Sequence, residues 1–156
     1  MDDRQFRNAM GKFATSVTVI ATEVEGQIHG MTANAFMSIS MNPKLIVISV
    51  RKQSSMLDLL KQSKFFSVNV LASNQKDVSA YFANQLKELE VEFARLDGKP
   101  VIKGAIAQVS CEIAGEHVEG DHTLIIGNVT DVHLEDEAPL IFYEGKYCTL
   151  AKETLV

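Results

Sequence analysis

Residue patterns that mark several common functional classes are missing from this chain of 156 residues. Its two cysteines, Cys111 and Cys148, lack the spacing of a disulfide framework or a zinc site, which favours a reduced protein inside the cell. The four histidines do not stand at the spacings of zinc ligands either. We therefore expect no metal site.

Long apolar runs and basic runs are also absent. No stretch approaches the ~20 apolar residues that cross a bilayer, and residues 1–13 lack the apolar centre of a signal peptide. Lys and Arg total 15 against 20 Asp and Glu, a net charge of −5, and no basic cluster suits a phosphate backbone. These absences predict a cytoplasmic protein that binds neither membranes nor nucleic acid.

Three glycine motifs of well-known sites are missing as well. The nine glycines never form the GxGxxG pattern of a Rossmann dinucleotide site. The phosphate loop GxxxxGK(S/T) and the nucleophile elbow GxSxG are absent too. A Rossmann domain, a P-loop NTPase and a hydrolytic triad therefore have no support in the sequence.

The patterns that are present predict a chain made mainly of β-strands with a few short helices. Apolar residues follow helical spacing over 3–13, 55–63 and 77–83. Strand-like runs cover 16–24, 27–35, 45–50, 65–72, 107–113, 122–134 and 140–150, with turns at Gly26 and Glu144-Gly145 and a bulge at Gly127. The charged, aperiodic segment 84–100 is expected to be an exposed excursion. We predict a single domain over residues 1–156, folded as a closed or partly closed β-barrel.

Residues 30–40, GMTANAFMSIS, alternate small or apolar side chains with polar ones. Small residues let backbone amides approach a flat heteroaromatic ligand, and the polar groups of Thr32, Asn34, Ser38 and Ser40 suit its edges. The same composition suits a β-arch whose polar groups satisfy their own backbone turns. These residues alone leave both interpretations open.

Two shorter segments suit an anion or a nucleotide. RKQSS, residues 51–55, stands before a predicted helix, where backbone N–H groups, hydroxyls and cations favour phosphate. Plain helix capping is the alternative. GDHT, residues 120–123, is a tight turn that either aims His122 into a cleft or leaves its imidazole in solvent.

Five segments together resemble a known family, in the same order along the chain. They are FRNAMGKFATSVTVI, GMTANAFMSISMNPKLIVISV, FFSVNVL, GDHTLIIGNV and PLIFYEGKY. They are similar to the flavin reductases of two-component flavin-dependent monooxygenases, in particular those that serve phenol and 4-hydroxyphenylacetate hydroxylases. The resemblance implies a split β-barrel of the flavin-reductase-like, FMN-binding type, and a homodimer with flavin near the subunit interface.

The resemblance also implies which residues bind the ligands. The flavin ring would lie against Thr32, Ala33, Asn34 and Ala35, and the ribityl and phosphate part against Ser38 and Ser40. Lys52, Gln53, Ser54 and Ser55 would contact the phosphates, and Phe82 and Ala83 the distal part. Asp121, His122, Thr123 and Tyr147 would bind NADH, with His122 orienting the nicotinamide. Cys148 stands where some relatives have histidine.

The implied activity is hydride transfer from NADH to FAD, with FMN as the other candidate flavin. NADPH is expected to serve less well. The reduced flavin would pass to a partner monooxygenase that hydroxylates aromatic compounds. Because the two cofactors carry the hydride chemistry, no catalytic triad is needed. A flavin carrier of the same fold is the alternative, although a carrier needs no nicotinamide site.

Overall fold

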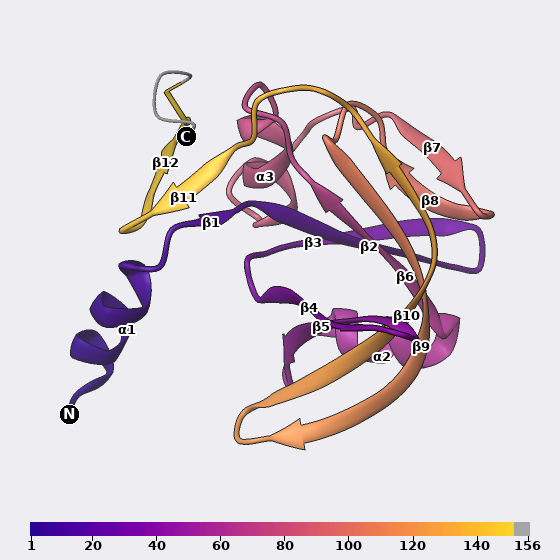
Figure 1. Cartoon of the computed structure of the whole chain (residues 1–156), viewed down its shortest axis with the longest axis horizontal. Helices are drawn as coiled ribbons and strands as arrows, with labels where there is room; N and C mark the ends of the chain where they lie inside the picture. The colour runs from indigo at the N-terminus through magenta and orange to yellow at the C-terminus, as the bar shows by residue number, and fades with distance from the viewer. Residues whose placement is uncertain (152–156) are drawn as a thin grey trace.

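The structure is a computed structural model that describes residues 1–151. Its main feature is an antiparallel sheet with the strand order β3-β2-β6-β9-β10-β5-β4 (Figure 1). These strands are β2 (Thr18–Val24), β3 (Gln27–Ala33), β4 (Phe36–Met41), β5 (Lys44–Arg51), β6 (Phe65–Val70), β9 (Ala107–Glu119) and β10 (His122–Leu134).

The connection between β3 and β4 shows that this sheet curls round on itself. The two strands form opposite edges of the sheet, yet only Asn34 and Ala35 separate them in the chain. Three steps of the backbone reach at most about 11 Å, so the two edges must come together. They share no ladder of hydrogen bonds. The sheet therefore curls in the manner of a barrel but is not closed into one, because a seam stays open between β3 and β4.

Smaller elements surround this barrel. A second sheet has the order β1-β11-β12, formed by β1 (Thr15–Ser16), β11 (Ile141–Tyr143) and β12 (Lys146–Cys148). A separate hairpin consists of β7 (Phe93–Leu96) and β8 (Lys99–Ile102). The helices are α1 (Asp3–Gly11), α2 (Ser55–Ser63) and α3 (Lys76–Phe82). In Figure 1, α1 stands apart at the left, and the turn between β9 and β10 protrudes at the bottom.

The apolar core explains why α2 lies where it does. Met56, Leu57 and Leu60 are its buried residues, spaced to form one face of the helix. They belong to the same cluster as Phe66 and Ile125 from the sheet. Ser54 caps the helix by accepting a hydrogen bond from the backbone N–H of Met56 at 3.2 Å. The predicted helix over 55–63 is confirmed at both ends.

Two hairpin turns form as predicted, and a bulge lies opposite Gly127, with its extra residue, Ala114, on β9. Glu25-Gly26 and Glu144-Gly145 all have positive φ, as tight hairpin turns require. The ladder between β9 and β10 shifts register at Gly127. A Cβ at Gly127 would lie 2.6 Å from Cζ of Phe66, so only hydrogen fits there.

The segment 84–100, expected to be an exposed excursion, was predicted wrongly at its C-terminal end. It contains β7 and the start of β8, where Lys99 and Pro100 are buried. The Lys99 ammonium donates to Oδ2 of Asp97 at 2.7 Å, and Arg95 forms a two-pronged ion pair with Glu23 of β2. The pair of Arg95 with Glu23 thus joins this hairpin to β2, which the composition of the segment alone did not indicate.

No helix within residues 1–151 is long and apolar enough to cross a membrane. The same residues contain no group of three His, Cys, Asp or Glu side chains that suits a metal ion.

Candidate functional site

A cavity of about 300 Å³ lies where the end of β3 meets α3 and the β11–β12 hairpin. Five predicted ligand-binding residues line it, from three separate parts of the chain: Thr32, Ala33, Asn34, Ala83 and Tyr147. The structure thereby brings one predicted flavin segment together with Tyr147, which was expected to bind NADH. The further lining residues were not expected from the sequence: Val17, Ser79, Gln85, Phe142 and Gly145.

Hydrogen bonds hold the walls of this cavity in place. The hydroxyl of Thr32 donates to the carbonyl oxygen of Ser79 at 2.7 Å, so it is already engaged by α3. The hydroxyls of Ser79 and Tyr147 are 2.7 Å apart. Asn34, by contrast, is exposed, and its side chain makes no hydrogen bond within residues 1–151. The side-chain amide of Asn34 is therefore free to bind a ligand. The hydroxyl proton of Thr32 is already donated to Ser79.

Phe82, which was also expected to contact the flavin, does not line this cavity. Its ring packs edge-on against Tyr81 and Phe93, with ring centroids 4.9 and 6.4 Å away. The ring also covers Gly30, where an added Cβ would lie 2.5 Å from the Phe82 ring. Glycine at position 30 is thus needed for the close approach of α3 to β3. Phe82 and Gly30 also line a separate surface cavity of about 400 Å³.

The second predicted binding region forms where the loop before α2 meets the turn before β10. The backbone N–H of Lys52 donates to the carbonyl oxygen of Asp121 at 3.1 Å, and His122 lies opposite Arg51 in the β5–β10 ladder. Lys52, Gln53 and Ser55 are exposed. The segments RKQSS and GDHT, 70 residues apart in the sequence, therefore make one continuous edge.

The two regions adjoin where the loop before α2 meets β3. The hydroxyl of Ser54 lies 3.6 Å from the sulfur of Met31, the residue before Thr32. The capping loop of α2 is thereby attached to the strand that leads into the 300 Å³ cavity. A ligand with a ring at Ala33 and a phosphate at Ser55 would follow this path along the protein.

Asp121 and His122 form an exposed pair at the outer edge. The Nδ1 atom of His122 lies 2.7 Å from Oδ1 of Asp121. This hydrogen bond is the main reason why the pKa of Asp121 is lowered, followed by the charge of His122. Asp121 thus keeps its negative charge beside the imidazole. Thr123 is only 2 % exposed, so its side chain serves the core of the sheet and is not available to a ligand in this chain.

Several predicted contacts are not brought together. Ser38 and Ser40 lie on the edge strand β4, opposite Ile46 and Leu45. Five to six residues of β5 separate these positions from Arg51, which is about 17–20 Å along a strand. Ala35 lies at the seam, where its carbonyl oxygen accepts from the backbone N–H of Ser49. Within a single chain, the two serines therefore lie apart from Lys52 to Ser55.

The predicted NADH residues are also divided between two places. Tyr147 belongs to β12 of the small sheet, whereas His122 begins β10 of the barrel. In Figure 1, β12 is at the upper left and the β9–β10 turn is at the bottom. In a single chain, Tyr147 faces the proposed ring end of the flavin, and His122 lies at the proposed phosphate end.

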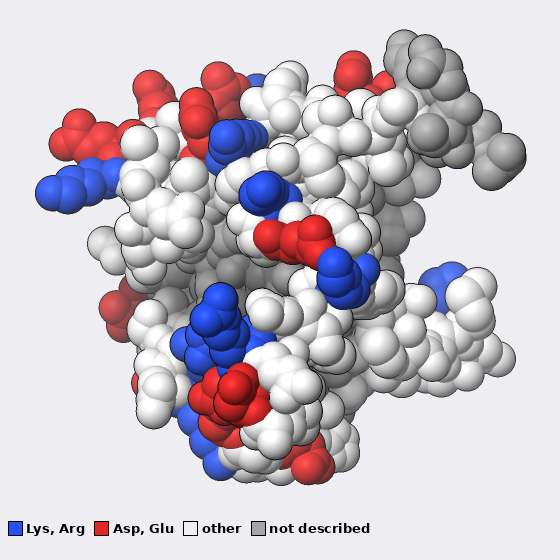
Figure 2. Space-filling view, turned by 90° about the vertical axis from the view of Figure 1, so that its left-hand side faces the viewer, with Lys and Arg blue, Asp and Glu red and all other residues white. Residues whose placement is uncertain are grey.

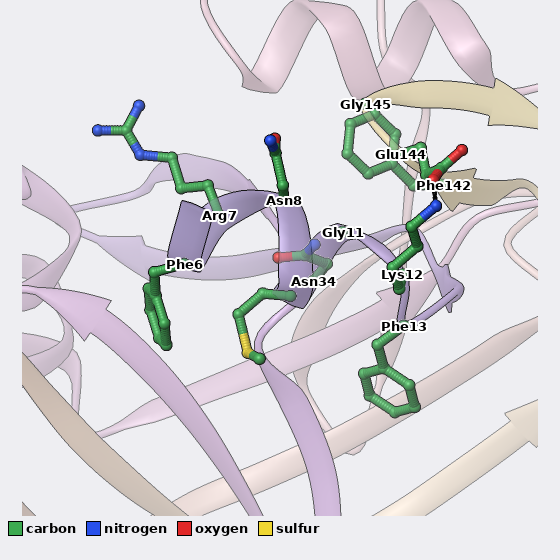
Figure 3. A pocket seen from close by; sticks show the side chains of 11 residues that line it. Phe6, Arg7, Asn8, Gly11, Lys12, Phe13, Asn34, Phe142, Glu144 and Gly145 are labelled. Carbon is green, nitrogen blue, oxygen red and sulfur yellow. Dashed lines mark hydrogen bonds and ion pairs between the residues drawn. The ribbon is translucent and has the colours of Figure 1, made fainter. Parts of the chain in front are cut away.

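A larger cavity, of about 680 Å³, lies between α1 and the body of the protein (Figure 3). It shares Asn34, Phe142 and Gly145 with the 300 Å³ cavity, so the two adjoin. In Figure 3, Phe6 and Phe13 project to one side of the α1 segment and Arg7 and Asn8 to the other. The helical spacing of the aromatic residues was visible in the sequence, but the cavity beside them was not.

The α1 segment touches the body through its C-terminal end. The carbonyl oxygen of Gly11 accepts from the backbone N–H of Glu144 at 3.0 Å, and Lys12 forms an ion pair with the Glu144 carboxylate. None of the residues of α1 is buried. Its apolar face is therefore presented to the cavity and to solvent.

Comparison with known proteins identifies the family. Residues 10–151 match the flavin reductase like domain. The chain is 36 % identical over 148 residues to an NADH-dependent flavin reductase from a Rhodococcus species, which covers 92 % of this chain and 84 % of the relative. It is 35 % identical over 143 residues to the reductase component of 4-hydroxyphenylacetate 3-monooxygenase from Thermus thermophilus, covering 91 % and 93 %.

Solved structures agree with this result. The flavin reductase PheA2 superimposes with a TM-score of 0.96 and 55 % sequence identity, covering 97 % of this chain and all of that chain. The NADH:FAD oxidoreductase SgcE6 of Streptomyces globisporus, in complex with NAD and FAD fragments, gives a TM-score of 0.89 at 31 % identity, covering 98 % and 95 %. This chain belongs to the flavin reductase family.

Proposed function

We propose that this protein transfers hydride from NADH to a flavin and supplies the reduced flavin to a separate monooxygenase. The observation that carries the proposal is the 300 Å³ cavity, where the small-walled segment Thr32–Asn34 meets α3 and Tyr147 in a flavin reductase fold. The relatives named above include a monooxygenase reductase component. We also propose that the partner monooxygenase acts on an aromatic substrate. This chain is proposed to act in the cytoplasm as a single domain.

The flavin is proposed to be FAD, with FMN as the other candidate. One relative is named an NADH:FAD oxidoreductase and another an FMN reductase. The ring would lie against Ala33, whose small side chain lets a flat group approach, and the Asn34 amide would bind its edge. The phosphates would lie at the N-terminus of α2, where Ser55 and the Lys52 ammonium provide a hydroxyl and a positive charge.

The protein's part in the reaction is to bind and orient two rings. The nicotinamide supplies the hydride, and the flavin accepts it. None of the residues that line the cavity is needed as an acid or a base, because positioning supplies much of the acceleration. Tyr147 would limit where the rings lie in the 300 Å³ cavity. His122 would orient the nicotinamide nucleotide from the region where the loop before α2 meets the turn before β10.

The protein is proposed to act as a homodimer. Phe6 and Met10 on α1 are 50 % and 57 % exposed, and Phe13, just after the helix, is 77 % exposed. Met37 and Met41 are exposed on the edge strand β4. The face that carries α1 is mostly uncharged, with acidic and basic side chains interspersed (Figure 2). An unpaired edge strand and an apolar helix face suit a second copy of the chain. A dimer would also bring a second set of ligand-binding residues close to the cavities.

The test is to mix the purified protein with NADH and with FAD, FMN or riboflavin in turn, and to follow the absorbance of reduced nicotinamide. We expect flavin-dependent oxidation of NADH well above the rate without protein, and slower oxidation of NADPH. If the protein binds flavin but does not accelerate the oxidation of NADH, the flavin carrier is supported and the reductase is contradicted. Absence of both binding and acceleration would contradict both interpretations.

A further inference from the structure

The one fully buried residue of the helix α3 is polar, although Val78 and Phe82 also pack against the core. Its seven residues, Lys76–Phe82, include a single buried position, which is Ser79, and its side chain is fully enclosed. Helices that pack on a protein normally bury apolar residues. The buried hydroxyl and carbonyl of a serine at this position must instead find hydrogen-bond partners.

Those contacts connect two segments that are far apart in the sequence. The carbonyl oxygen of Ser79 accepts from the hydroxyl of Thr32, and its own hydroxyl lies 2.7 Å from that of Tyr147. Thr32 belongs to β3 and Tyr147 to β12, so Ser79 joins the barrel to the small sheet. Both neighbours line the 300 Å³ cavity, and Ser79 lines it between them.

Tyr147 depends on contacts of this kind for its position. The strand β12 has three residues and pairs only with β11, at the edge of the small sheet. The Tyr147 ring packs edge-on against Phe142 with centroids 5.5 Å apart, and the Lys76 ammonium lies 5.4 Å from its centroid. These contacts hold the ring, whereas the hydroxyl is held by Ser79.

We propose that Ser79 is a positioning residue, which fixes the Tyr147 hydroxyl relative to Thr32 and so sets the spacing of the walls between which the reacting rings lie. This inference rests on the proposed function of the cavity. A wall that moves by a fraction of an ångström leaves the ligands bound by their phosphate ends but misplaces their rings. The hydride step is sensitive to such misplacement.

The experiment measures kcat and KM for NADH at saturating flavin in three variants. Ser79→Ala removes only the hydroxyl, since the carbonyl that binds Thr32 belongs to the backbone. We expect kcat to fall about tenfold, equivalent to about 1.4 kcal/mol, with KM for NADH changed less than twofold. Tyr147→Phe keeps the ring and is expected to lower kcat similarly. The double variant is expected to be no slower than the slower single variant, because both changes break the same contact.

Ser110→Ala is the matched control. Ser110 is also fully buried, and its hydroxyl donates to the carbonyl oxygen of Leu96 at 2.8 Å, in the region of the β7–β8 hairpin. This variant is expected to lose thermal stability and to keep both kinetic constants. A Ser79→Ala variant with unchanged kcat, or effects of Ser79→Ala and Tyr147→Phe that multiply in the double variant, would overturn the positioning role.

The outcome of the wild-type assay separates this inference from the function on which it rests. A wild type that oxidises NADH, together with variants that behave as the control does, contradicts the role of Ser79 alone. A wild type that does not oxidise NADH contradicts the proposed function, and the positioning role is overturned with it.

Discussion

At the scale of single residues, the two cysteines have opposite surroundings. Cys111 is fully buried in the barrel core, and burial raises the pKa of its thiol to about 12. At pH 8 this group therefore stays protonated, and it is shielded from reagents as well. Cys148 is exposed at the end of β12.

Thiol labelling checks this difference. With an aromatic disulfide reagent at pH 8, we expect one thiol per native chain to react quickly, and Cys148→Ser to abolish that reaction. In denaturant, two thiols per wild-type chain should react. Rapid reaction of both thiols in the native protein would mean that the core around Cys111 opens readily.

Gly127 offers a second prediction at this scale, since its hydrogen faces the core. A methyl group there would meet Phe66 at 2.6 Å and Cys111 Cβ at 3.0 Å. Gly127→Ala is therefore expected to lower the free energy of unfolding by roughly 1–3 kcal/mol, measured by urea denaturation. Gly115→Ala is the control, because the nearest atom to its new Cβ is 3.9 Å away. Equal stability of the two variants would contradict the close packing at the bulge.

At the scale of elements, α1 is the helix that its own chain covers least. It has nine residues, no buried side chain and an apolar face of Phe6 and Met10. Helices this short are marginal in water unless a tertiary surface covers them. Contacts at Gly11 and Lys12 fasten only its C-terminal end.

If a second copy covers this face, polar substitutions there will weaken the dimer. Phe6→Ser combined with Met10→Ser is expected to raise the dimer dissociation constant at least tenfold, measured by analytical ultracentrifugation. Arg7→Ser is the control, because Arg7 projects to the other side of the helix in Figure 3. A wild type that sediments as a monomer at micromolar concentration would contradict the proposed dimer.

The elements also show what could be predicted from the sequence. Hairpins at Glu25-Gly26 and Glu144-Gly145 were predictable because their turn residues act locally. The β7–β8 hairpin was missed because its support comes from distant residues, such as Glu23 for Arg95. The Thr32–Asn34 segment stood out by its composition. Ser79 did not, because a single serine in a helical stripe gives no signal until its neighbours in space are known.

At the scale of the whole molecule, the open seam between β3 and β4 lies beside the cavity that is proposed to bind the flavin ring. Because β3 and β4 meet only through Asn34 and Ala35, the cavity at this junction is reached from outside the barrel. The loop before α2 lies farther along, next to Met31. His122 is adjacent to that loop through the contact of Asp121 with Lys52. In the proposed function, one long edge of the molecule would therefore serve two nucleotides.

Two substitutions at this edge distinguish which nucleotide each residue holds. Lys52→Ala is expected to weaken the binding of FAD and FMN about tenfold, the loss of one charge-assisted contact of roughly 1.4 kcal/mol. Riboflavin, which carries the ring without a phosphate, should bind this variant as it binds the wild type. His122→Ala is expected to raise KM for NADH about tenfold while leaving riboflavin affinity unchanged.

Direct flavin titrations and steady-state kinetics at saturating riboflavin measure these effects separately. His122 contacts Asp121, whose carbonyl binds Lys52, so a purely structural role would make His122→Ala resemble Lys52→Ala in flavin binding. Such a result would assign both residues to the flavin phosphates and would leave the nicotinamide nucleotide to be held elsewhere. Unchanged constants in His122→Ala would instead identify His122 as a solvent-exposed turn residue. A selective effect on NADH alone supports the division of this edge between the two ligands.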